Sequence, residues 1–170
     1  MIVVSDTSPL NYLVLIEQAN VLPILFGRVV APPAVIAELL HPAAPAVVRA
    51  WVAAPPNWLE THEPTTVDPA LRIGPGEAQA ISLARELGAD VLLMDEREGM
   101  GIARKMGLFV TGTLGVLEVG TEKGLVRLPE AVAALRRTSF RVSESLLEEM
   151  LARDAERARA QGQDPRPTSE

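Results

Sequence analysis

The sequence contains no cysteine, which excludes disulfide bonds and thiolate metal sites. It has only three Phe, one Tyr and two Trp, too few for an extended platform on which nucleic-acid bases stack. No apolar run reaches the roughly 18 residues of a membrane-spanning helix. The first residues also lack the basic segment and apolar run of a signal peptide. We therefore expect a cytoplasmic protein from a reducing compartment.

Basic residues are also in the minority, with 16 Lys and Arg against 22 Asp and Glu and a net charge of −6. A net negative charge opposes binding to nucleic acid. The excess is divided, however, because residues 1–143 carry 12 basic and 15 acidic side chains and residues 144–170 carry 4 and 7. If four acids of the first part belong to a metal site, the rest of that part is nearly neutral. The charge therefore weakens a nucleic-acid partner without excluding it.

Short apolar segments alternate with helical patterns along a chain of 170 residues, 48% of which are hydrophobic. The length is sufficient for one domain with its own core. Strands are expected at residues 2–5, 28–31, 58–62, 90–95 and 108–111. Helices are expected at residues 9–17, 21–27, 33–40, 45–54, 77–87, 98–106, 113–123, 129–137 and 143–160. This alternation predicts an α/β fold with a mostly parallel sheet.

Four acidic residues stand out in this pattern. Asp6 and Asp95 each follow a predicted strand, whereas Glu38 and Glu77 lie in apolar helical stretches. Sites in parallel α/β folds lie outside the carboxyl ends of the strands. No Lys or Arg lies within helical reach of Glu38, although buried charges are usually paired or bound to metal. Crowded carboxylates raise one another's pKa values, and Mg²⁺ or Mn²⁺ relieves this repulsion. We therefore predict a metal site that can activate water and hold a phosphodiester.

Each acid also has a purely structural interpretation. Asp6 could cap the helix that follows it, and Glu38 could face solvent. Glu77 lies in a first helical turn, where the helix dipole favours a carboxylate. Asp95 could be a turn residue beside Glu96. The four acids together favour a site, but their spacing alone is not a specific motif.

Four stretches of the sequence resemble the PIN-domain family, and in particular its VapC-like branch. They follow the family's order and are "VSDTSPLNYL", "VVAPPAVIAELL", "GPGEAQAISLARELGADVLLMDEREG" and "GLFVTGTLGVLEVGTEKGLV". The resemblance covers about residues 2–150. It implies a three-layer α/β/α sandwich over residues 1–150, followed by a helix end and polar tail at 151–170. It also implies a Mg²⁺- or Mn²⁺-dependent ribonuclease, a cognate antitoxin that blocks the site in toxins of this type, and a homodimer.

The resemblance identifies the four acids with the family's acidic quartet. Asp6 and Asp95 are then expected to bind the metal most directly, and Glu38 and Glu77 to complete the site directly or through water. For the homodimer, an apolar helix such as residues 45–54 can supply the interface.

Four hydroxyl residues accompany the acids. The resemblance implies that Thr7 and Ser8 steady Asp6 or touch phosphate. Thr111 and Thr113 follow a later strand, where some PIN proteins carry another acid, and their hydroxyls could orient a water molecule. For Thr113 the role of helix N-cap is favoured over that of water positioning.

Two residues depart from the pattern of the VapC-like branch. Glu96 stands where relatives often have a second aspartate, and Met100 stands where arginine is common. The loss of that arginine weakens the expected contact with substrate, although Arg97 and Arg104 are near in the sequence.

Alternative functions follow from these departures. One is a catalytically weak or inactive PIN-fold module that binds nucleic acid or protein. A weaker alternative is a phosphotransfer receiver-like domain, although the chain lacks the expected strand-end lysine. The only histidines, His41 and His62, make a histidine triad or zinc site improbable. For the charged segment 143–159, a solvated terminal helix is favoured over a partner contact.

Overall fold

The protein is described by a computed structural model covering residues 1–162. Five strands form one sheet in the order β3-β2-β1-β4-β5, and every neighbouring pair is parallel. The strands are β1 (Val3–Ser5), β2 (Val29–Ala31), β3 (Leu59–Thr61), β4 (Val91–Leu93) and β5 (Val110–Thr111). The predicted parallel α/β architecture is confirmed, with β3 at an edge of the sheet.

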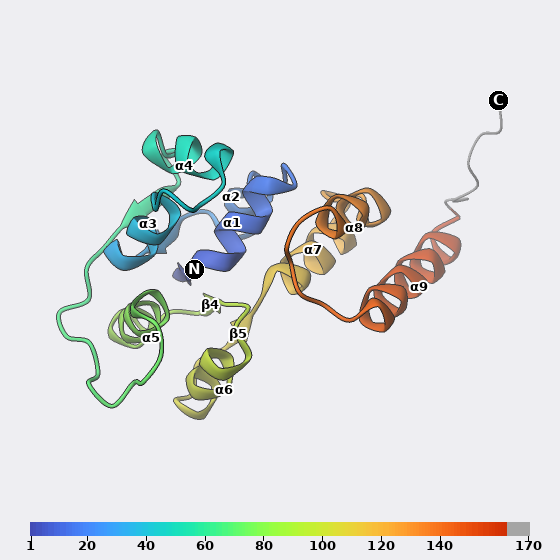
Figure 1. Ribbon diagram of the computed structural model, residues 1–170. Helices are drawn as coiled ribbons and strands as arrows, with labels where there is room; N and C mark the ends of the chain where they lie inside the picture. Colours follow the sequence, from blue (N-terminus) through green and yellow to red (C-terminus); the bar gives the residue numbers. More distant parts are fainter. Residues whose placement is uncertain (163–170) are drawn as a thin grey trace.

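Helices cover both faces of the sheet (Figure 1). They are α1 (Thr7–Leu15), α2 (Val21–Phe26), α3 (Pro33–Leu39), α4 (Ala46–Ala53), α5 (Pro75–Leu87), α6 (Arg97–Lys105), α7 (Thr113–Glu122), α8 (Leu128–Arg136) and α9 (Glu144–Ala160). Successive strand residues point to opposite faces. Val3 and Leu93 therefore join the core under α1 to α4 and α7 to α9, whereas Val4 and Leu92 join a second core under α5 and α6. The result is a three-layer α/β/α sandwich.

The strands are shorter than predicted, but most helices end within two residues of their predicted limits. The strand expected at 90–95 pairs only over 91–93, which leaves Asp95 in the loop beyond the sheet. The first helix begins at Thr7 rather than Pro9. Pro9 then lies within the first turn, where proline fits because the N–H groups of a first helical turn have no partner within the helix. For the same reason α5 begins at Pro75 and places Glu77 at its third position.

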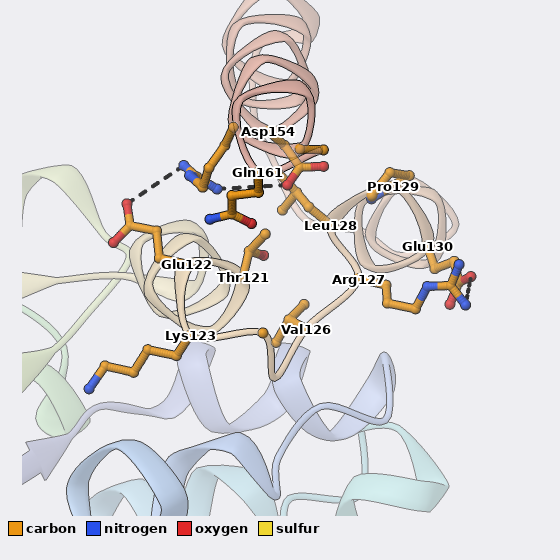
Figure 2. Close-up of a pocket in the computed structure, with 13 residues that line it drawn as sticks. Thr121, Glu122, Lys123, Val126, Arg127, Leu128, Pro129, Glu130, Asp154 and Gln161 are labelled. Atoms are coloured by element: carbon orange, nitrogen blue, oxygen red, sulfur yellow. Dashed lines mark ion pairs between the residues drawn. The ribbon is translucent and has the colours of Figure 1, made fainter. Parts of the chain in front are cut away.

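The last helix was expected to be a solvated terminal helix, and the structure confirms this for most of its residues but buries one side of it. Leu147 and Met150 of α9 are buried against the larger core. Arg153 pairs with Glu118 of α7 at 3.0 Å. A cavity of about 700 Å³ lies between parts of α7, α8 and α9, and Figure 2 shows its lining residues. Helix α9 therefore packs against the rest of the chain through its apolar residues, which recur at helical spacing.

Residues 163–170, which include most of the predicted polar tail, lie outside the described part of the chain. Across residues 1–162, no helix combines the length and apolar character needed to cross a membrane.

Candidate metal centre

Asp6 lies where β1 ends and α1 begins, and it is only 3% exposed. Its backbone N–H donates to the carbonyl of Leu93 at 2.8 Å, which ties this position to the end of β4. Asp6 occupies the N-cap position, but its side chain makes no capping hydrogen bond. One carboxylate oxygen, Oδ1, is buried without a hydrogen-bond partner. Helix capping, the structural interpretation of Asp6, therefore does not account for this buried carboxylate.

The electrostatics of Asp6 reflect its burial and its neighbours. The pKa of Asp6 is raised to about 7, and loss of water contact is the largest cause. The nearby charges of Glu77, Glu38 and Asp95 contribute to this shift, and the Thr7 backbone N–H opposes it. A carboxylate with a raised pKa and an unpartnered oxygen is stabilised by a cation. The three acids that act on it are the other members of the predicted quartet.

Glu38 lies in the last turn of α3 and is held by two donors from other elements. The Thr7 hydroxyl donates to Oε2, and the Gly76 backbone N–H donates to Oε1 at 3.1 Å. A Cβ atom at Gly76 would lie 2.6 Å from both carboxylate oxygens, so only glycine allows this approach. Thr7 was expected to steady Asp6 or touch phosphate, and in the structure its hydroxyl instead bonds Glu38. Glu38 is exposed, as its structural interpretation held, but its carboxylate is fixed rather than free.

Glu77 is half-buried in the first turn of α5. Burial raises its pKa, and the charges of Glu96, Glu38 and Glu98 add to the shift. A Cβ atom at Gly99 would lie 2.8 Å from Glu77 Oε2, so the start of α6 approaches this carboxylate closely. A favourable helix dipole is therefore only part of the environment of Glu77.

Asp95 lies in the loop between β4 and α6, and both its oxygens accept hydrogen bonds from Thr113. The Thr113 backbone N–H donates to Oδ1 at 2.7 Å, and the hydroxyl donates to Oδ2 at 2.7 Å. Burial raises the pKa of Asp95, the two Thr113 bonds oppose the shift, and Glu96 adds to it. The favoured role of Thr113 as N-cap was wrong. Gly112 holds that position, and the fully buried Thr113 orients the carboxylate instead.

The topology explains why acids from distant parts of the chain come together. Ser5 pairs with Leu93 in the sheet, so the residues that follow β1 and β4 emerge side by side. Helix α3 follows β2, the other neighbour of β1, and packs against α5. The carboxyl ends of adjacent parallel strands thus carry Asp6 and Asp95, and α3 and α5 carry the two glutamates.

The donor set fits a hard divalent cation, because it consists of carboxylate oxygens around a buried, unpartnered Asp6 Oδ1. As the side chains stand, residues 1–162 contain no group of three carboxylates or imidazoles placed to enclose an ion. The hydrogen bonds explain this, since Glu38 and Asp95 are turned toward Thr7, Gly76 and Thr113.

The sequence argument did not include Glu96 and Glu98 among the acids of the site. The charge of Glu96 acts on both Glu77 and Asp95, and that of Glu98 acts on Glu77. The available signal was the position of Glu96 directly after Asp95, which had been interpreted only as a departure from a family pattern.

The remaining candidates lie around this centre or away from it. Ser8 lines a small cavity together with Asp95. A Cβ atom at Gly115 would lie 2.0 Å from the Thr111 hydroxyl, so that threonine packs closely against α7. The histidines lie elsewhere, since His41 Nδ1 accepts from the Ala43 backbone N–H. His62 directly follows the edge strand β3, and its Nε2 lies 3.3 Å from the Glu60 carboxylate of that strand.

Comparisons with known proteins agree with this architecture. A family model described as a PIN domain matches residues 2–156. A solved structure of a PilT N-terminus domain protein from the hyperthermophilic archaeon Sulfolobus solfataricus P2 is similar, with 14% sequence identity and a TM-score of 0.51. The similarity covers 84% of this chain and 100% of that one, and at this identity it shows the fold alone. A search of curated proteins found no match.

Proposed function

Because the chain belongs to the PIN-domain family, we propose that it is a ribonuclease of the VapC toxin type that depends on Mg²⁺ or Mn²⁺. PIN domains are commonly nucleases, which gives the general class. The observation that carries the metal-dependent activity is the environment of Asp6. Its carboxylate is 3% exposed, leaves Oδ1 without a partner and lies within the electrostatic reach of three other acids. Such a group is costly to ionise in a folded protein unless a cation joins it.

The side chains have distinct roles in this proposal. Asp6 and Asp95 hold the ion most directly, and Glu38 and Glu77 complete its surroundings directly or through water. A bound divalent ion supplies charge stabilisation at phosphorus and lowers the pKa of water. Thr113 keeps Asp95 in one orientation through two hydrogen bonds, a support that typically affects metal affinity strongly.

The metal site is tested by calorimetric titration with Mn²⁺ at pH 8. We expect stoichiometric binding to the wild type and loss of binding in the double variant Asp6→Asn/Asp95→Asn. Glu63→Gln is the matched control, because Glu63 is exposed and its side chain makes no hydrogen bond or ion pair within residues 1–162. Binding that survives unchanged in the double variant would place the ion elsewhere and refute the assignment.

The activity is tested on labelled single-stranded RNA and single-stranded DNA of the same sequence. We expect cleavage of the RNA with Mn²⁺, none in EDTA and none by Asp6→Asn or Asp95→Asn. The inactive variants, purified in the same way, control for contaminating nuclease. If the wild type binds Mn²⁺ but leaves every RNA intact, the proposed ribonuclease activity is refuted and the proposed metal site is retained.

A second candidate is a catalytically weak or inactive PIN-fold module that binds nucleic acid or protein. Two observations favour it. Both Asp95 oxygens already accept hydrogen bonds from Thr113, and no three acids within residues 1–162 are placed so that they could enclose an ion. This module predicts no Mn²⁺ binding, no cleavage, and a complex with its partner that persists in the Asp6→Asn/Asp95→Asn variant.

We also propose a cytoplasmic setting with a cognate antitoxin and a homodimer as the protein partners. Large apolar side chains on the surface support a protein interface, including Val47 of α4, which is 56% exposed. Light scattering of the purified chain measures the oligomeric state. A mass of one chain at all concentrations would refute the homodimer.

A further inference from the structure

A second concave region lies directly beside the candidate metal centre. It is a cavity of about 730 Å³ between α6, α7 and the loop 138–142 that leads into α9, and Asp95 forms part of its wall. Its apolar lining, which we call the floor, is made by Met100, Leu114, Val142 and Leu146. We call it the loop cavity.

The loop cavity adjoins a smaller one of about 300 Å³ that is also lined by Asp95 and by Ser8 and Tyr12 of α1. Four residues line both cavities, namely Asp95, Glu96, Phe140 and Arg141, and we call the last two the ridge. The ridge is fixed in place, because the Tyr12 ring meets the Phe140 ring edge-on at a centroid distance of 4.9 Å. The hydroxyl groups of Tyr12 and Ser139 are also hydrogen-bonded at 3.0 Å.

Two cations border the loop cavity without an acidic partner. Within residues 1–162, neither Arg97 nor Arg141 forms an ion pair, although both lie beside a cluster of carboxylates. Some arginines of α8 and α9 are paired, since Arg136 and Arg153 each contact a glutamate. Unpaired guanidinium groups at a cavity wall suit phosphate, to which they can donate in pairs.

The apolar floor, the aromatic ridge and the two free cations together match the parts of one nucleotide. Any base can stack on an aromatic ring, and the phosphates of the nucleotide can accept hydrogen bonds from the arginines. An apolar peptide would use the floor but would leave both guanidinium groups unsatisfied. Because Asp95 lines the loop cavity, the cavity borders the place where the reacting phosphate is expected.

We propose that the loop cavity seats a nucleotide of single-stranded RNA next to the scissile phosphate, with Phe140 stacking on its base and Arg97 and Arg141 contacting its phosphates. This inference rests on the proposed ribonuclease function. It also accounts for Met100, which stands where relatives often have arginine. In this chain Met100 forms apolar floor, and the positive charge comes from Arg97 at the start of α6 and from Arg141 of the loop.

Binding of fluorescein-labelled single-stranded RNA, followed by anisotropy in EDTA, tests the proposal without relying on cleavage. Removal of Arg97 or Arg141 by substitution with Ala is expected to weaken binding about tenfold and to reduce the slope of log affinity against log salt by about 0.7 each. Arg159→Ala is the matched control, because Arg159 lies near the far end of α9. Its position is about 24 Å along the helix axis from Ser143, where the loop joins α9. Arg159 lines neither the loop cavity nor the smaller cavity beside it, and its removal is expected to change neither quantity.

The stacking contact is tested by Phe140→Leu, which keeps apolar volume and removes the ring. We expect about a tenfold loss of RNA affinity and recovery of affinity in Phe140→Tyr. Because Phe140 also packs on the core, thermal melting of both variants checks that they fold. Cross-linking of 5-iodouridine RNA gives a second measurement in the wild type, and we expect the adduct in residues 138–142.

The outcomes separate this inference from the proposed function. If the wild type cleaves RNA with Mn²⁺ but the loop-cavity variants match Arg159→Ala in affinity and salt slope, the nucleotide site is wrong and the ribonuclease stands. Cross-links confined to other segments would lead to the same conclusion. If the wild type neither binds nor cleaves RNA, both proposals fail.

Discussion

Asp6 makes the metal-free protein sensitive to pH in a direction opposite to that of most carboxylates. Burial, chiefly, raises its pKa from an ordinary value of 3.8 to about 7. Between these two values the folded protein keeps a proton that the unfolded chain has released. The stabilising effect of this proton is therefore fully present below about pH 4 and is lost as the pH rises through about 7. Asp6→Asn removes the titrating group and should remove this loss.

The size of the effect follows from the shift. One pKa unit corresponds to about 1.4 kcal/mol, so the complete loss amounts to about 4 kcal/mol. About 2 kcal/mol of this falls between pH 5 and pH 7, where most single domains remain folded. The free energy of unfolding is measured in EDTA by urea denaturation at several pH values. The difference between Asp6→Asn and wild type should grow by that amount over this interval, in favour of the variant.

Two further measurements complete this test. Glu63→Gln, at an exposed position without side-chain partners within residues 1–162, should follow the wild type at every pH. Saturating Mn²⁺ should restore the stability of the wild type at pH 7 and above and leave Asp6→Asn much less affected, because a ligand stabilises only the state that binds it. Parallel curves for wild type and Asp6→Asn from pH 5 to pH 8 would refute the raised pKa of this carboxyl group.

Two other substitutions test how the carboxylates are held. Gly76→Ala places a Cβ atom 2.6 Å from the Glu38 oxygens, so Mn²⁺ affinity measured by calorimetry should fall at least tenfold. The control is Gly101→Ala, whose Cβ meets no atom within 4 Å; it should keep metal affinity and raise helix stability by up to about 1 kcal/mol. Equal Mn²⁺ affinity in the two variants would contradict the packing argument. Thr113→Val removes the hydroxyl that bonds Asp95 and should lower Mn²⁺ affinity about 10- to 100-fold, with recovery in Thr113→Ser; a Val variant as tight as wild type would show that Asp95 needs no such support.

The sequence was sufficient to predict the sheet and the approximate positions of the acids. Apolar triplets such as Val91–Leu93 are buried on both faces, as parallel strands require. Their alternation with helical patterns leaves few possible topologies. Once β1 and β4 are neighbours, Asp6 and Asp95 must emerge at the same edge. This part of the site was predictable because it depends on chain direction and strand order alone.

The partners of each acid were not predictable in the same way. The bond from Thr7 to Glu38 spans 31 residues, and the bonds from Thr113 to Asp95 span 18. No local periodicity encodes such pairs, because they depend on how loops and helix ends meet in three dimensions. The packing of α9 was missed for a related reason. Its two buried residues, Leu147 and Met150, lie among many charged ones, and helical spacing alone does not show which surface will receive them.

Glu96 shows how a residue that departs from a pattern can still belong to a site. It occupies the N-cap of α6 without a capping hydrogen bond, and its charge raises the pKa of both Glu77 and Asp95. Glu96→Gln removes that charge, so both neighbours should ionise at lower pH. The pH at which Mn²⁺ binding is half-maximal should then move downward in a calorimetric series from pH 5 to pH 8. A midpoint that stays in place or moves upward would show that Glu96 does not act on its neighbours through charge, and the cluster would then reduce to the four acids whose position follows from strand order.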